Sequence, residues 1–207
     1  MRILVSMILI ALAPLAAAEK GFTSLFNGKD LTGWKVSENP GTFTVQDGAI
    51  VAHGPRSHCF YMGPFRNHTF QDFELKVDVM TKPGSNGGIY IDTEYLENNW
   101  PAKGFEVQVN NTFVKDPRKT GSLYQVKDNG QEVARDNVWF TEHIIAKGNT
   151  ITVKVDDKLV TEWTQPADWA GVKSFPDRRI RPGTIALQGH DPESTVYYKN
   201  IRIKPLK

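Results

Sequence analysis

The sequence predicts an all-β protein, a β-sandwich or barrel of short strands. Three observations lead to this fold class. Apolar and polar residues alternate in many short segments, which is the period of a half-buried strand. Clusters of Gly, Pro, Asn and Asp separate these segments, as expected of turns. After the N-terminal stretch, no segment of ten or more residues has the period of an amphipathic helix, and no repeat or low-complexity linker divides the chain.

The N-terminus has the features of a secretory signal peptide. Arg2 is followed by an uncharged apolar run that ends in three alanines at Ala18. Such a pattern predicts cleavage after Ala18 and export to the periplasm or the extracellular space. A retained membrane anchor is the alternative, although the run is shorter than the ~20 apolar residues that span a bilayer. We expect residues 19–207 to form a single domain.

Composition narrows the classes of partner. The chain has 25 Lys and Arg against 23 Asp and Glu, for a formal net charge of +2. So small an excess gives no support to binding of nucleic acid or of an anionic membrane surface. Cys59 is the only cysteine, so no internal disulfide can form and the fold must rest on core burial.

The chain begins with a predicted cap and continues as strands. Residues 22–34 place large apolar side chains among turns, which favours a segment tucked under the domain. Residues 42–52 have the pattern of a hairpin around Asp47-Gly48. The predicted strands span residues 42–45, 49–52, 70–80, 89–92, 104–110, 121–126, 138–146, 150–156, 159–163, 183–190 and 194–204.

Residues 53–68 form a predicted loop that is rich in metal-ligand residue types. It contains His53, His58, Cys59 and His68. Their spacing fits no established ligand pattern, and no helical period would bring the imidazoles together. A loop at the mouth of a binding site is therefore favoured over a metal site.

A second long loop, residues 164–183, contains Arg178, Arg179 and Arg181. These arginines would suit an anionic ligand. A solvated basic loop is the favoured interpretation, because isolated clusters of arginine are usually hydrated.

Residues 104–110 give the clearest indication of a binding surface. Phe105, Val107 and Val109 fall on one face of the predicted strand, and Glu106, Gln108 and Asn110 fall on the other. Carboxylate and amide groups suit a sugar, whose hydroxyls both donate and accept hydrogen bonds.

Other predicted strands repeat this pattern. Tyr90 and Asp92 share one face, as do Gln188 and His190. These strands are far apart in the sequence, so they can form one site only if they stack side by side. We expect a shared hollow to be lined by Tyr90, Glu106, Tyr124, Gln188 and His190.

Six blocks, in order, cover nearly all of the chain after residue 18: LFNGKDLTGW (25–34), SNGGIY (85–90), GFEVQ (104–108), TGSLY (120–124), GTIALQGH (183–190) and KNIRI (199–203). Together they resemble the 3-keto-disaccharide hydrolase family. The resemblance implies a concanavalin A-like jelly roll of two curved antiparallel sheets with a sugar groove, export, and hydrolysis of glycosides oxidised at C3. The chain departs from the family pattern at residues 85–88, at Thr141 and Glu142, and at Asn110.

The implied substrate changes the catalytic requirement. Ordinary glycosidases need two carboxylates, for which Glu106 and Asp92 would be the candidates. A 3-keto group instead acidifies the C2 proton, so that one base can start an elimination that water later completes. Glu106 or His190 is the candidate base, with Gln188 and Tyr124 holding the sugar or the enolate.

The full set of substrate-binding candidates is Tyr90, Asp92, Gln108, Tyr124, Gln188, Asn86 and Trp139. The expected partner is a small carbohydrate, and the oligomeric state stays open. No cofactor is expected. A divalent metal would stabilise an enolate, and Asp92, Glu106 and His190 are suitable ligand types, but no ligand spacing requires one.

Two functions from other classes stay open. The first is a non-catalytic, lectin-like module in which Trp100, Trp139 and Trp169 stack on sugar rings. The second is a structural interaction domain, for which a polar row on one sheet face would have no use.

Overall fold

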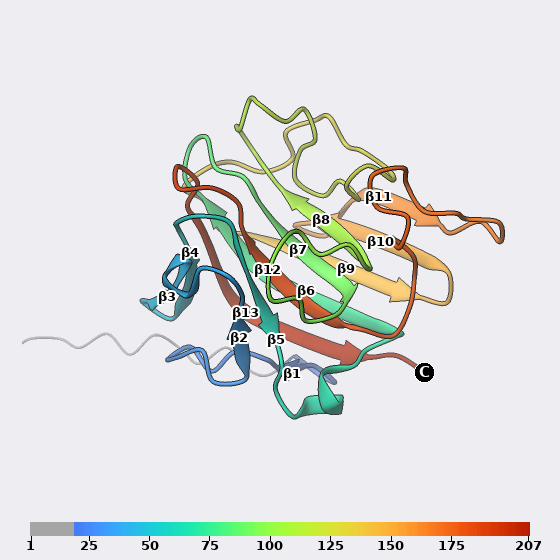
Figure 1. The fold of residues 1–207 in the computed structure, drawn as a ribbon, viewed down its shortest axis with the longest axis horizontal. Helices are drawn as coiled ribbons and strands as arrows, with labels where there is room; N and C mark the ends of the chain where they lie inside the picture. Colours follow the sequence, from blue (N-terminus) through green and yellow to red (C-terminus); the bar gives the residue numbers. More distant parts are fainter. Residues whose placement is uncertain (1–18) are drawn as a thin grey trace, which may run out of the picture.

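The computed structural model describes residues 19–207, which form two antiparallel sheets (Figure 1). The larger sheet has eight strands in the order β11-β10-β9-β6-β13-β4-β3, with β1 paired to β13. The smaller has five, in the order β2-β5-β12-β7-β8. The predicted signal peptide, residues 1–18, lies outside the described residues. In the part of the chain from residue 19 onward, no helix is long and apolar enough to cross a membrane.

The chain passes repeatedly from one sheet to the other, so strands that are neighbours in a sheet, such as β6 and β13, are often distant in sequence. The short 3-10 turns Pro40–Thr42 and Phe65–His68 are the helical elements of the described residues. The strands are β1 (Thr23–Ser24), β2 (Trp34–Val36), β3 (Phe43–Gln46), β4 (Ala49–Ala52), β5 (Ser57–Tyr61), β6 (Phe73–Thr81), β7 (Gly87–Thr93), β8 (Phe105–Val109), β9 (Phe140–Lys147), β10 (Thr150–Val155), β11 (Lys158–Thr164), β12 (Thr184–Gly189) and β13 (Val196–Pro205).

The core lies between the two sheets. Leu75 and Val77 of β6 belong to the same buried cluster as Ile89 of β7 and Leu187 of β12. Each such side chain contributes about 1.5–3 kcal/mol when fully buried, so a domain of this size needs no cross-link. The thiol of Cys59 is free and buried in this core.

Two of the strand predictions were wrong. Residues 57–61, predicted as part of a loop, form β5, an interior strand of the smaller sheet between β2 and β12. His58 and Phe60 alternate with the inward Cys59 and Tyr61, but nearby Gly and Pro obscured this period. Residues 121–126, predicted as a strand, form a turn region joined to β8 by one isolated bridge, between Leu123 and Val107.

Candidate functional site

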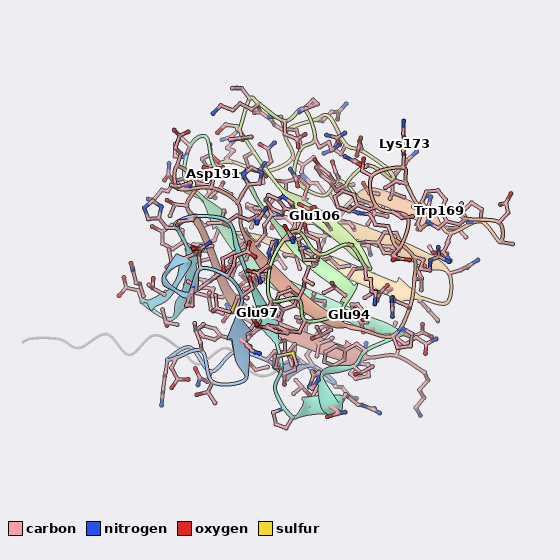
Figure 2. All side chains as sticks on the ribbon, in the orientation of Figure 1. Glu94, Glu97, Glu106, Trp169, Lys173 and Asp191 are labelled. Carbon is pink, nitrogen blue, oxygen red and sulfur yellow. The ribbon has the colours of Figure 1, made fainter. Side chains whose placement is uncertain are left out.

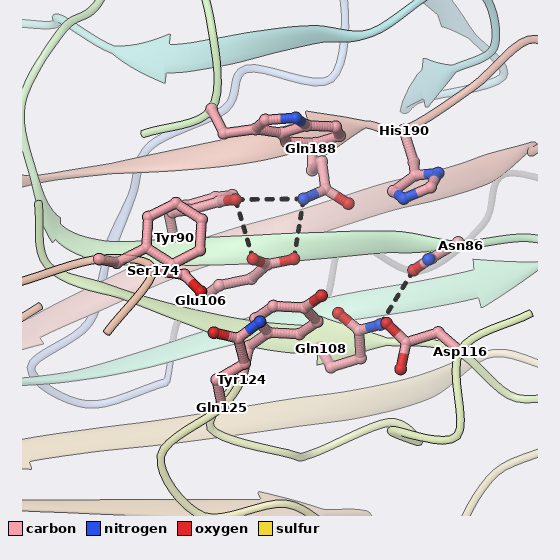
Figure 3. Close-up of a pocket in the computed structure, with 12 residues that line it drawn as sticks. Asn86, Tyr90, Glu106, Gln108, Asp116, Tyr124, Gln125, Ser174, Gln188 and His190 are labelled. Carbon is pink, nitrogen blue, oxygen red and sulfur yellow. Dashed lines mark hydrogen bonds between the residues drawn. The ribbon is translucent and has the colours of Figure 1, made fainter. Parts of the chain in front are cut away.

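A cavity of about 380 Å³ lies on the outer face of the five-stranded sheet, away from the core (Figure 3). Strands β7, β8 and β12 supply its floor, and three loops supply its walls. It is lined by Asn86, Tyr90, Trp100, Glu106, Gln108, Asp116, Tyr124, Gln125, Ser174, Phe175, Gln188 and His190. All five side chains expected to share a hollow therefore line one cavity.

Strand register explains why these side chains meet. Tyr90 of β7 lies opposite Glu106 of β8, and Gly88 lies opposite Gln108. Gly88 leaves the middle of the floor open, because a Cβ there would lie 3.0 Å from Glu106 Oε1. The sequence therefore forms a hollow by placing a glycine between large polar neighbours.

Glu106 is the centre of a buried hydrogen-bond network. Its Oε2 accepts a bond of 2.9 Å from the Tyr90 hydroxyl, and its Oε1 accepts a bond of 2.8 Å from Gln188 Nε2 (Figure 3). The guanidinium of Arg178 lies 3.4 Å from Oε2. Both charged side chains are almost fully buried, so each depends on the other for compensation.

Arg178 pins the 165–183 loop over the cavity. It donates a 2.8 Å bond to the Tyr124 carbonyl, and its guanidinium lies 4.2 Å from the centre of the Phe175 ring. The Arg178 carbonyl in turn accepts a 2.7 Å bond from Trp169 Nε1. Arg178 is thus part of the site, whereas a solvated loop was the favoured prediction.

The two tyrosines of the cavity are neutral hydrogen-bond donors. Burial and the nearby Glu106 charge raise the pKa of Tyr90 well above its usual value. Burial and the charges of Asp116 and Glu106 also raise the pKa of Tyr124. Neither phenol ionises near neutral pH, so both can donate to oxygen atoms of a ligand or a neighbour.

His190 forms a dyad with the next residue. Its Nδ1 lies 2.6 Å from Asp191 Oδ2, and Asp191 also accepts bonds from the Ser194 hydroxyl and amide, at 2.9 and 3.0 Å. Although burial opposes it, hydrogen bonding from His190 and Ser194 holds the pKa of Asp191 below its usual value. An ionised Asp191 fixes the proton on Nδ1, which leaves Nε2 as an acceptor.

Two amides present unused acceptors. The Nε2 atom of Gln108 donates a 3.0 Å bond to Asn86 Oδ1. The Nε2 atom of Gln188 donates a 2.8 Å bond to Glu106 Oε1. The Oε1 atoms of Gln108 and Gln188 are buried and have no partner among the described residues. Buried acceptors are normally satisfied, so these atoms favour a ligand that offers several hydrogen-bond donors, as a sugar does.

Two predicted binding residues lie outside the cavity. Asp92 has a φ of 54° beside a register shift between β7 and β12, which breaks the alternation that placed it on the face of Tyr90. Its carboxyl is buried and has no hydrogen-bond partner within residues 19–207, and burial raises its pKa well above the usual value. Trp139 precedes β9 and packs against Tyr197 and Lys199 of β13, which belongs to the same eight-stranded sheet as β9.

The other two tryptophans considered for stacking on sugar rings have different surroundings. Trp100 lines the cavity, whereas Trp169 packs on Trp163 with ring centres 5.0 Å apart. Among residues 19–207, no group of three or more His, Cys, Asp or Glu side chains is arranged to hold a metal.

Sequence reasoning missed several residues of the site. Asp191 follows His190 directly and could have been recognised as its carboxylate partner. Asp116, Ser174 and Phe175 come from long loops whose path no local pattern indicates.

A match to a known family covers nearly all of the described residues. Residues 21–204 match the family described as the 3-keto-alpha-glucoside-1,2-lyase-like domain. The chain belongs to this family. The resemblance seen in six sequence blocks is therefore confirmed. The 3-keto-alpha-glucoside-1,2-lyase-like family and its fold are those of carbohydrate-active proteins. No curated protein matches the chain.

Solved structures share the jelly-roll fold, which confirms the predicted architecture. A "putative glycosyl hydrolase" from Parabacteroides distasonis ATCC 8503 is 24% identical, with a TM-score of 0.76 over 90% of this chain and 94% of the other. Carbohydrate binding module CBM66 from Bacillus subtilis is 14% identical, with a TM-score of 0.56 over 83% and 95%. The GH16 endo-beta-1,3(4)-glucanase SCLam is 13% identical, with a TM-score of 0.56 over 90% and 92%.

Proposed function

We propose that the protein is an exported hydrolase that cleaves 3-keto-disaccharides or 3-keto-glycosides by base-assisted elimination followed by hydration. The observation that carries the proposal is the His190–Asp191 dyad at the rim of a cavity lined with hydroxyl-binding groups. Family membership supports the substrate class, and the apolar run before Ala18 supports export.

The reaction starts at C2 of the oxidised ring. The C3 ketone acidifies the C2 proton, and His190 Nε2 takes it, because Asp191 holds the other ring nitrogen protonated. The electron pair forms an enolate, whose collapse restores the C3 ketone, forms a C1=C2 double bond and breaks the C1–O bond. The departing oxygen receives the proton from the His190 imidazolium. Water then adds across the C1=C2 bond, its oxygen to C1 and a proton to C2. The sum is hydrolysis, with the base returned to its neutral form.

Glu106 has a different role in this scheme. Its oxygens already accept bonds from Tyr90 and Gln188 and face Arg178, so the carboxylate is engaged as an acceptor. It binds and orients sugar hydroxyls rather than taking the C2 proton. The neutral phenol of Tyr124 is the donor for the enolate oxygen, where charge develops in the transition state.

The test is incubation of purified protein with a panel of native and 3-oxidised disaccharides. We expect breakdown of the oxidised sugars only. His190→Gln should lower kcat/KM by at least about hundredfold, the usual contribution of a general base. The control is His143→Gln, because His143 pairs with Glu74 on the outer face of the other sheet.

The panel also tests the alternatives. A parallel series with a chelator measures any requirement for a divalent metal. Binding of native disaccharides with no breakdown of oxidised sugars would overturn the enzymatic proposal and favour a carbohydrate-binding module. Full activity of His190→Gln would reject the assignment of the base.

A further inference from the structure

His58 lies directly beside the cavity but is sealed from it. It sits on β5 opposite Gln188 of β12, so it continues the polar row of the cavity floor. Its ring lies 5.4 Å from that of Tyr90 and 5.5 Å from that of Trp100. The side chain is fully buried, although Gln188, its neighbour on the floor, lines the cavity.

Both ring nitrogens of His58 lack a hydrogen-bond partner among residues 19–207. Burial is the main cause that lowers its pKa to about 3, so the ring is neutral and carries one donor and one acceptor. Burying a hydrogen-bond donor and an acceptor without partners costs free energy. A ligand that supplies both an acceptor and a donor would remove this cost.

Trp100 packs against His58 and also lines the cavity. Its ring centre lies 5.5 Å from that of His58 and 5.4 Å from that of His190. Trp100 belongs to residues 94–104, which connect β7 to β8. In the described structure these residues make no backbone–backbone hydrogen bonds, and most of them are exposed.

Contacts that involve side chains therefore hold this loop in place. The backbone N–H of Asn99 donates to the Glu38 carboxylate, and Glu38 is also paired with Arg56. Segments with few backbone bonds and high exposure open at low free-energy cost. The cover over His58 is thus attached by contacts that a ligand can replace.

We propose that Trp100 is a displaceable cover, and that the space beneath it, floored by His58, is a subsite for the departing sugar of a two-ring substrate. This inference rests on the proposed function, which puts C2 of the oxidised ring at His190. In that scheme the oxygen leaving C1 takes its proton from His190, so it lies beside the imidazole ring, whose centre is 5.4 Å from that of Trp100. A sugar hydroxyl both donates and accepts, as the neutral His58 ring requires.

The experiment compares a 3-keto-disaccharide with methyl 3-keto-glucoside, which has no second ring. His58→Phe keeps an aromatic ring but removes both nitrogens. We expect the ratio of kcat/KM for the disaccharide to kcat/KM for the methyl glucoside to fall about tenfold, the effect of one lost hydrogen bond. His58→Gln, which restores a donor and an acceptor, should recover most of the ratio. The matched control is His143→Phe, on the outer face of the other sheet.

A second measurement needs no turnover. Titration of a native disaccharide should change tryptophan fluorescence in the wild-type protein, and Trp100→Phe should lose most of that change. His58→Phe should weaken the measured Kd about tenfold while the protein still unfolds cooperatively.

The outcomes separate the two proposals. If the wild-type protein cleaves neither 3-keto substrate, the proposed function fails, and the titration then decides the subsite. If the protein cleaves both substrates but His58→Phe leaves their ratio unchanged, the subsite proposal is overturned and the proposed function stands.

Discussion

Glu142 provides the sharpest test of the structure, because an acid lies where the core should be apolar. It occupies an inward position of β9, between Phe140 and Ile144, both of which belong to the core. The side chain is fully buried, and neither carboxyl oxygen has a partner among the described residues. Burial therefore raises the pKa of Glu142 well above its usual 4.5, and the nearby Gly121 amide opposes this only in part.

The sign of the pH effect follows from proton binding. Above pH 4.5 the unfolded chain releases this proton while the folded chain keeps it, so rising pH favours unfolding. Each pH unit costs about 1.4 kcal/mol until the folded carboxyl also ionises. Glu142→Gln removes the titration. Its stability relative to wild type should thus rise by up to about 2.3 kcal/mol from pH 4.5 to 6.5, because the unfolded carboxyl is already half ionised at pH 4.5.

Urea unfolding followed by tryptophan fluorescence at pH 4.5, 5.5 and 6.5 measures this difference. The pKa of the buried Asp92 is also raised, but Asp92 is present in both proteins. Its contribution to the pH dependence therefore cancels in the difference between their stabilities. Glu162→Gln, an exposed change on β11, is the control and should stay within about 0.5 kcal/mol of wild type. A difference for Glu142→Gln that does not vary with pH would refute the inward, unpaired placement.

Two further substitutions test the cavity itself. Arg178→Met leaves the Glu106 charge buried without its partner, so urea unfolding should show a loss of about 3–5 kcal/mol; a loss below about 1 kcal/mol would contradict the buried pair. Gly88→Ala puts a methyl group 3.0 Å from Glu106 Oε1, which must shift, so kcat/KM on methyl 3-keto-glucoside should fall roughly tenfold. Gly41→Ala, where a Cβ would meet open space, is its control, and equal activity of the two variants would exclude a tight floor.

The sequence determined the sheet faces because alternation is a local property. Successive side chains on a strand point to opposite faces, so Glu106 and Gln108 had to share one, and likewise Gln188 and His190. The same rule failed at Asp92, where a positive φ at a register shift turned the side chain away. A register shift depends on the partner strand, which the pattern of a single strand does not contain.

Only the tertiary structure decided what covers the floor of the cavity. Arg178 reaches Glu106 from 72 residues away, and Trp100 comes to lie between His58 and His190, which local spacing does not predict. The path of a loop depends on a few distant contacts, such as Trp169 on Trp163, rather than on a repeating pattern. The chain thus encoded its strands locally, whereas the walls of the cavity required the whole fold.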